Sequence, residues 1–285
     1  MGRHMILYRG ALRSCNYHCS YCPFSKHRAS EKELDKDRRG WLRFCGSLEE
    51  RAARLDLHAL LVVPYGEALL HPWYWEGLAS LSALPAMDAV GAQTNLSFSL
   101  QESLGRFRQA GGKVEKLRLW ATFHPEMVQI EDFVAKCRTV REAGVSLCAG
   151  AVGVPENIDL LRRLREALPK ELYLWINRMD GLKRPYTEGE REAFGKIDPF
   201  FHRELKVVRA DPSRCAGRLF VESDGRLRSC NISPPMEINW YDLQDRLPEP
   251  VCDRKRCSCY LAYGGREDLA EKEAFGAYPL FRILT

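Results

Sequence analysis

The alternation of short β-like runs with amphipathic helical patterns is the feature that most restricts the fold of this chain. Strand patterns occupy six places, at residues 6–9, 59–64, 89–94, 116–122, 146–152 and 173–177. Helical patterns lie between them, at residues 48–57, 73–84, 100–110, 130–143 and 157–168. Such alternation is typical of βα units around a parallel sheet. Six units are fewer than the eight of a closed barrel, so the pattern fits an α/β fold with an open sheet or a partial barrel.

The pattern changes after about residue 197. The sequence predicts a hairpin between Cys215 and Cys230, with strands at 218–222 and 226–229 on either side of Ser223-Asp224-Gly225, and a final helix at 267–274. We therefore expect a barrel over residues 5–198 and a small α+β domain over 199–285. Residues 1–4, Met-Gly-Arg-His, are typical of a cloning scar before a natural start at Met5.

Charge and hydropathy exclude several classes of protein. The net charge of +5 comes from 43 Lys and Arg against 38 Asp and Glu, which are spread along the chain, whereas nucleic-acid binding usually needs a clustered basic surface. No run approaches the roughly 18 apolar residues that cross a membrane, and the N-terminus lacks the apolar core of a signal peptide. We expect a cytoplasmic protein without nucleic-acid or membrane partners.

Eight of the eleven cysteines fall into two groups, one near each end of the chain. In a chain of this size without an export signal, clustered cysteines indicate metal binding more than disulfides. The first group, Cys15, Cys19 and Cys22, has the spacing C-x3-C-x2-C and follows the first predicted strand. Thiolates are the ligands of iron-sulfur clusters, and a structural zinc site would need a fourth ligand, which is missing locally.

This spacing, with the aromatic Tyr21 directly before the third cysteine, resembles the defining motif of the radical S-adenosylmethionine (SAM) superfamily. The resemblance implies a partial (β/α)6 TIM barrel, a [4Fe-4S] cluster on Cys15, Cys19 and Cys22, and SAM as the second cofactor. The stretches Leu7-Tyr8-Arg9-Gly10 and Tyr21-Cys22-Pro23-Phe24 are similar to a small bacterial subfamily.

Later strand ends carry pieces that resemble SAM contacts of the superfamily. Residues 65–72 are similar to its Gly-Gly-Glu-Pro motif, in which Gly66 would let the backbone approach SAM and Glu67 would receive the methionine amino group; Tyr65 and Ala68 depart from the motif. The remaining SAM contacts that the resemblance implies are Tyr21, Thr94, Asn95, Thr122 and Arg178. A surface salt bridge is the alternative role for Arg178.

The second cysteine group resembles the auxiliary-cluster domains called SPASM and, in the shorter form, Twitch. The likeness rests on the spacing Cys215-x9-Gly225-x4-Cys230, and five cysteines imply one auxiliary [4Fe-4S] cluster. Its other two ligands would come from Cys252, Cys257 and Cys259. The leftover cysteine could be inert, could bind in one redox state or could donate a hydrogen atom as a catalytic residue. Zinc on four of these thiolates is the alternative.

The resemblance implies that the reduced first cluster cleaves SAM to a 5'-deoxyadenosyl radical, which abstracts a hydrogen atom from the substrate. The auxiliary cluster would then aid oxidation or electron transfer; a radical epimerase with a Cys hydrogen donor and a non-catalytic zinc or iron-sulfur protein are the alternatives. Because the first strand pattern begins at Ile6, we expect a small-molecule substrate or a ribosomal peptide delivered by a separate partner. A flavodoxin or ferredoxin would supply electrons.

Overall fold

A single nine-stranded sheet forms the centre of the protein. The structure is a computed structural model that describes residues 4–24, 26–215, 217–259 and 271–285. The strands lie in the order β10-β9-β8-β1-β2-β3-β4-β5-β6. Their bounds are β1 (His4–Arg9), β2 (Leu57–Val62), β3 (Ala89–Thr94), β4 (Leu117–Phe123), β5 (Ser146–Gly153), β6 (Leu174–Arg178), β8 (Arg218–Glu222), β9 (Arg226–Arg228) and β10 (Pro235–Asn239). Strands β1 to β6 are parallel to one another, and all six strand patterns of the sequence are confirmed.

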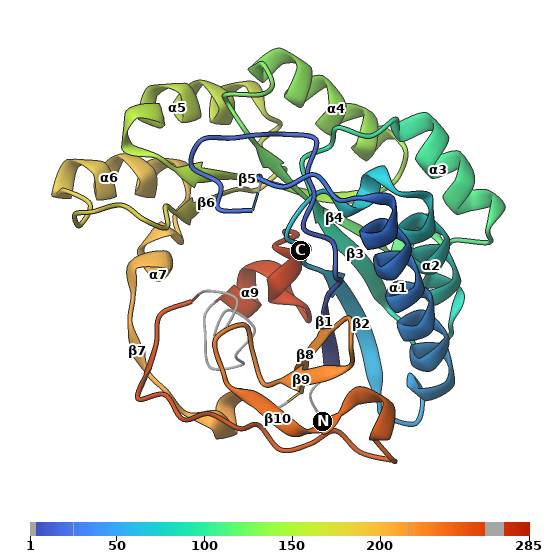
Figure 1. Cartoon of the computed structure of the whole chain (residues 1–285). Coiled ribbons are helices and arrows are strands. Elements are labelled where there is room, and N and C mark those ends of the chain that lie inside the picture. The colour runs from blue at the N-terminus through green and yellow to red at the C-terminus, as the bar shows by residue number, and fades with distance from the viewer. Residues whose placement is uncertain (1–3, 25, 216, 260–270) are drawn as a thin grey trace.

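Helices form an arc on the outside of this curved sheet (Figure 1). They are α1 (Glu31–Arg51), α2 (Pro72–Ala83), α3 (Leu100–Gln109), α4 (Ile130–Glu142), α5 (Ile158–Ala167), α6 (Glu188–Ile197) and α7 (Phe201–Leu205), while α9 (Glu271–Phe275) lies inside the curve. The expected partial barrel is therefore confirmed. No helix in the described part of the chain is both long and apolar enough to cross a membrane.

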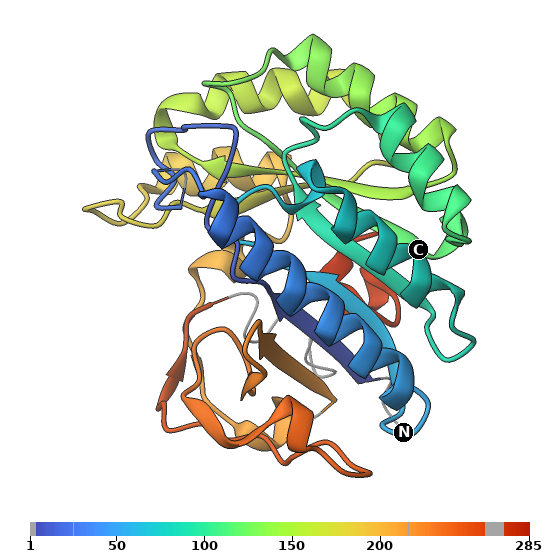
Figure 2. The same ribbon diagram turned by 45° about the vertical axis from the view of Figure 1, so that its right-hand side comes forward.

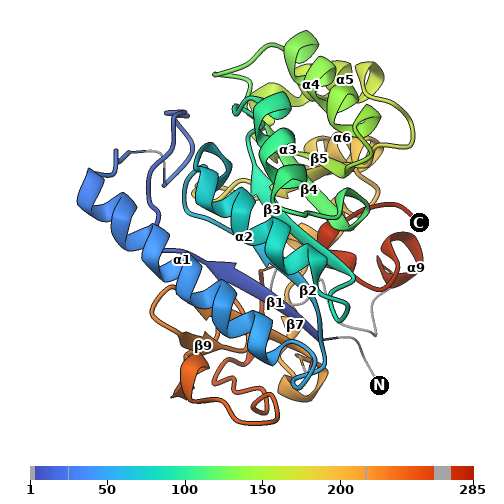
Figure 3. The same ribbon diagram turned by 90° about the vertical axis from the view of Figure 1, so that its right-hand side faces the viewer.

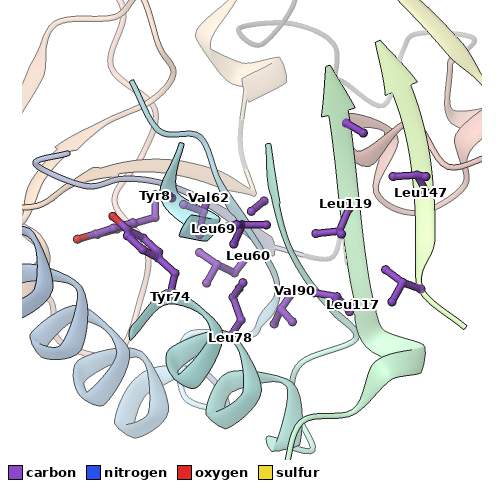
Figure 4. Close-up of a cluster of buried hydrophobic side chains, with 14 of the residues drawn as sticks. Tyr8, Leu60, Val62, Leu69, Tyr74, Leu78, Val90, Leu117, Leu119 and Leu147 are labelled. Carbon is purple, nitrogen blue, oxygen red and sulfur yellow. The ribbon is translucent and has the colours of Figure 1, made fainter. Parts of the chain in front are cut away.

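The sheet is buried on both faces, as expected for parallel strands. Alternate residues of each strand point outward, where Leu60 and Val62 pack against Tyr74 and Leu78 of α2 (Figure 4). The intervening residues point inward and contact the C-terminal segment, in which Phe281 is buried. The C-terminal segment therefore fills part of the inside of the barrel. The carboxyl ends of the strands are left for ligands.

Helix α1 begins far before the predicted start at residue 48, and Leu57 belongs to β2 instead of the helix. Ser30 and Glu33 form a capping box, in which each side chain accepts a hydrogen bond from the other residue's backbone N–H. Buried Trp41, Phe44 and Leu48 then provide an apolar stripe at helical spacing. Because charged residues dominate the first turns, the sequence pattern revealed only the last part of this helix.

The predicted hairpin is confirmed and continues the main sheet. Strand β8 pairs antiparallel with β9, and Gly225 in the turn has a φ of +83°, which favours glycine. Strand β8 also pairs parallel with β1, and Figure 2 and Figure 3 show the orange hairpin region beside β1 and α1. The boundary between residues 198 and 199 stays a prediction, although a continuous sheet crosses it.

The structure also differs from the sequence predictions in the C-terminal part of the chain and at its N-terminus. Strands β7 (Val208–Arg209) and β11 (Arg256–Cys257) form a separate antiparallel pair that was not predicted. Residues 267–270 of the predicted final helix lie outside the described residues, and α9 begins at Glu271. Residues 1–3 of the predicted scar also lie outside them, whereas His4 pairs with Leu57 in the sheet.

Candidate active site

A pocket opens at the carboxyl ends of the first four strands, where ligands of parallel α/β folds usually bind. Its lining includes eight of the residues singled out from the sequence: Cys15, Cys19, Cys22, Gly66, Glu67, Thr94, Asn95 and Thr122. These residues come from the loops after β1, β2 and β3 and from the end of β4. The fold thus brings together four segments of the chain, from the cysteine loop to Thr122.

The loop with the three cysteines rests directly against Gly66. The backbone N–H of Glu67 donates to the carbonyl oxygen of Ser14 at 3.0 Å. A Cβ atom at position 66 would lie 1.8 Å from that same oxygen, which only a glycine avoids. At the other end of the loop, the backbone N–H of Ser20 donates to the carboxylate of Glu126 at 2.6 Å, so the cysteine loop is held from two sides.

The three thiols face the pocket in a setting suited to a metal. Burial raises the pKa of Cys15 and raises the pKa of Cys19 to about 11, so these two thiols stay protonated until a cation replaces the proton. Two N–H donors point at the Cys15 Sγ, the backbone of Tyr17 at 3.4 Å and the amide of Asn95 at 3.7 Å. These bonds would stabilise a thiolate.

Within the described residues, no three His, Cys, Asp or Glu side chains stand close enough to enclose one metal ion. An iron-sulfur cluster is wider than one ion, so its thiolates stand farther apart around it. Three cysteines on one loop, lining one pocket, fit that larger group and leave one of its four irons without a protein ligand.

Glu67 is the buried carboxylate of the pocket, with a side chain only 2% exposed. Its Oε1 accepts from the Leu69 N–H at 3.2 Å and from the Thr94 hydroxyl at 2.7 Å, and its Oε2 accepts from the Asn95 N–H at 2.5 Å. Burial raises the pKa of Glu67 to about 7 despite these donors. A cation placed beside Oε2 would stabilise the ionised form, so the site favours an ammonium group.

Asn16 joins the cysteine loop to the end of β3. Its Oδ1 accepts from the Asn95 amide and from the Ser97 hydroxyl, each at 3.1 Å. Sequence reasoning missed Asn16, and its only signal was a position directly after the first cysteine. Together with Glu67, this residue fixes the side chain of Asn95 within the pocket.

Tyr21 and His124 form a pair at the edge of the site. The Tyr21 hydroxyl lies 2.9 Å from the His124 Nδ1, and His124 lines the pocket together with Thr122. Burial lowers the pKa of His124 to about 4, so the imidazole is neutral at physiological pH. Tyr21 itself does not line the pocket in the described part of the chain, and this geometry makes it a support for His124.

Arg178 lies apart from the other predicted contacts. It lines a different pocket at the end of β6, between β6 and α6, together with Arg184, Tyr186 and Arg191. Its guanidinium pairs with Asp180 at 3.5 Å. This contact is the salt bridge expected as the alternative role of Arg178. A role for Arg178 in SAM binding stays a prediction.

The second cysteine group gathers around the β8–β9 hairpin. Pairing of Phe220 with Arg228 brings the segments of Cys215 and Cys230 to the end of the hairpin opposite its turn. Ser229, next to Cys230, exchanges hydrogen bonds with Val251, next to Cys252, at 2.7 and 2.9 Å.

Two other contacts bring in the remaining thiols of this group. The amide of Asn231 donates to the Cys259 Sγ at 3.6 Å, and β11, which contains Cys257, pairs with β7 close before Cys215. All five segments thus meet in one region, and which four thiols ligate one metal centre stays a prediction.

The fold of this chain is similar to that of solved protein structures. No protein-family model matches the chain, and no curated protein matches it. Native anSMEcpe with bound AdoMet and Cp18Cys peptide matches 84% of this chain and 78% of its own, at 14% identity and a TM-score of 0.56. Native anSMEcpe with bound AdoMet matches 98% and 82%, at 13% identity and a TM-score of 0.52.

BtrN in complex with AdoMet and 2-DOIA also matches, over 81% of this chain and 74% of its own at 16% identity, but its TM-score of 0.39 is too low to carry an argument. At such low identity the anSMEcpe likeness concerns the fold. Together with the curved parallel sheet, it identifies the fold of this chain as a partial TIM barrel like that of anSMEcpe.

Proposed function

We propose that this chain is a radical SAM enzyme whose first cluster is held by Cys15, Cys19 and Cys22. The observation that carries the proposal is the convergence of these thiols with Glu67, Thr94 and Asn95 on one pocket. When bound, a reduced [4Fe-4S] cluster supplies the electron that cleaves SAM into methionine and a 5'-deoxyadenosyl radical, which abstracts a hydrogen atom from the substrate.

The residues around the pocket bind and orient SAM. Glu67 accepts the methionine ammonium at Oε2, and the donors from Leu69 and Thr94 keep its carboxylate in place. Thr122 also lines the pocket and contributes a hydroxyl to it. His124 is neutral near physiological pH, and its Nδ1 lies 2.9 Å from the Tyr21 hydroxyl, so the two side chains hold each other at the edge of the pocket.

We further propose that four of Cys215, Cys230, Cys252, Cys257 and Cys259 hold one auxiliary [4Fe-4S] cluster. This proposal is supported by the five cysteine segments, which lie together around the hairpin. Such a cluster would accept the second electron of an oxidation. A small molecule or a ribosomal peptide brought by a partner is the proposed substrate, with flavodoxin or ferredoxin as the electron donor.

The test begins with anaerobic reconstitution of the protein. Two clusters give about eight irons per chain, whereas bound zinc without iron would favour a non-catalytic metal protein. Dithionite and SAM should then give 5'-deoxyadenosine. Replacing Cys15, Cys19 and Cys22 together by Ala should abolish that product and leave about four irons.

A matched control replaces a cysteine outside both groups. Cys137→Ala removes a buried thiol of α4 that lines neither pocket and should leave the iron content and the cleavage of SAM as they are. If the triple variant still forms 5'-deoxyadenosine, the assignment of the first cluster is wrong.

A further inference from the structure

Two arginines lie over one tyrosine ring at the pocket. The guanidinium carbon of Arg9, at the end of β1, is 4.1 Å from the ring centre of Tyr65, and that of Arg13 is 5.2 Å from it. Tyr65 lines the pocket with the three cysteines, and Phe24 of the same lining lies 4.6 Å from its ring. Both cations therefore stack on a residue that lines the pocket where SAM and a substrate would meet, while neither arginine is itself part of the described lining.

Neither arginine has a carboxylate within 4.0 Å in the described part of the chain. The hydrogen bonds of Arg9 go to neutral acceptors: the carbonyl of Val63 at 3.1 Å, the hydroxyl of Tyr65 at 2.9 Å and the amide oxygen of Asn231 at 2.8 Å. Arg13 is exposed and has no carboxylate within 4.0 Å among the described residues.

The neighbouring carboxylate of Glu222 is already engaged. It pairs opposite Arg9 in the β1–β8 ladder, yet its oxygens contact Arg226 at 2.9 Å and Arg228 at 2.8 Å. Burial lowers the pKa of Arg9, because removal from water disfavours its charge. An anion placed against the two arginines would offset that cost.

The position of Arg9 also links the two cysteine groups. Asn231 accepts from Arg9 and donates to the Cys259 Sγ at 3.6 Å, while Tyr65 faces the pocket of the first group. A substrate that loses a hydrogen atom at the first site and an electron to the second would have to lie between them. The arginine pair stands in that interval.

We propose that Arg9 and Arg13 bind an anionic group of the substrate, a carboxylate or a phosphate, with Tyr65 fixing the two guanidinium groups by stacking. Arginine suits this task because its planar donors match the oxygens of both groups. The proposal deepens the proposed function and rests on it, since the anion is taken to belong to the substrate of that active site.

Equilibrium dialysis tests the proposal with the reconstituted, SAM-loaded protein and two labelled probes, inorganic phosphate and succinate. We expect saturable binding of at least one probe, and the probe that binds identifies the anion. Arg9→Gln and Arg13→Gln should each weaken it about tenfold, the loss expected for a hydrogen bond to a charged group. Arg9→Lys, which keeps the charge, should weaken it less than Arg9→Gln.

Arg43→Gln is the matched control. Its guanidinium also stacks on a tyrosine, 3.7 Å from the ring centre of Tyr241, but it belongs to α1 and this tyrosine, unlike Tyr65, does not line the pocket. Probe binding in this variant should equal that of the unmodified protein. Because Arg13 is exposed, Arg13→Gln is expected to fold even if Arg9→Gln does not.

Three results would overturn the inference. They are the absence of saturable binding of either probe, equal binding by the Arg13→Gln variant and the control, and a loss of SAM affinity in Arg13→Gln, which would assign the arginines to the carboxylate of SAM itself. Formation of 5'-deoxyadenosine by the unmodified protein tests the proposed function separately. Cleavage without probe binding overturns the anion site alone, and absence of cleavage overturns the proposed function.

Discussion

Replacing Glu67 by Gln should weaken SAM binding while the fold survives. The amide retains one oxygen, which can still accept from Leu69 and Thr94, but it presents an NH2 group where Oε2 now accepts from the Asn95 N–H at 2.5 Å. In the variant, the NH2 group of the new amide would face the Asn95 N–H, so two donors would lie together without an acceptor. The variant also removes the negative charge that receives the methionine ammonium.

The size of the effect follows from the burial of this carboxylate. A hydrogen bond to a charged group in a buried site is worth about 1 to 3 kcal/mol, which corresponds to a roughly five- to 150-fold weaker Kd. Since the pKa of Glu67 is about 7, its ionised share falls about eightfold between pH 7.5 and pH 6. Fuller protonation of the α-amino group of SAM offsets part of this, so the affinity of the unmodified protein should fall about fivefold.

Equilibrium dialysis of labelled SAM at both pH values measures these effects. Asp198→Asn is the matched control, because Asp198 is another buried carboxylate, which accepts from Ile176, Phe200 and Tyr173 and does not line the pocket. Its SAM affinity should equal that of the unmodified protein. Equal affinity of Glu67→Gln and the unmodified protein, or an equal fall in the affinity of Glu67→Gln between pH 7.5 and pH 6, would refute the role given to this carboxylate.

Three further predictions concern the cysteine sites and the fold. Single Ala variants of Cys252, Cys257 and Cys259, reconstituted and assayed for iron, should show two that lose about four irons and one that keeps them; retention by all three contradicts the ligand set. Gly66→Ala places a Cβ atom 1.8 Å from a backbone oxygen of the cysteine loop, so it should prevent assembly of the first cluster, as iron counts will reveal. Ser30→Ala removes the cap of α1 and should lower the free energy of unfolding by about 1 kcal/mol, measured by urea denaturation.

Much of the barrel could be predicted because strand and helix periods are local properties. The predicted bounds of β3, residues 89–94, agree with the structure, because its apolar run lies between a turn and a helix pattern. Helix α1 was mostly missed, because its apolar stripe is hidden among charges and its capping box joins only two residues. Strand β10 was missed as well, since its register is set by β9 and not by its own alternation.

The candidate site shows the same division between local and distant information. Spacing alone grouped Cys15, Cys19 and Cys22, and the superfamily resemblance located Glu67. Two of the three hydrogen bonds that fix Glu67, those from Thr94 and Asn95, depend on contact between the ends of β2 and β3, which no local pattern specifies. The placement of Arg178 in a separate pocket also could not be read from sequence, because side-chain direction at a strand end is decided by its neighbours.

The pairing of β8 with β1 bears on how this protein can be divided. Five residue pairs, from Met5–Arg218 to Arg9–Glu222, cover what would otherwise be an open edge of the barrel sheet. A fragment ending at residue 198 would expose the backbone groups of β1, and exposed edge strands invite intermolecular pairing and aggregation. The C-terminal segment is thus part of the folding unit and not a detachable accessory. Chimeras that exchange it between related enzymes would have to carry β1 along with it.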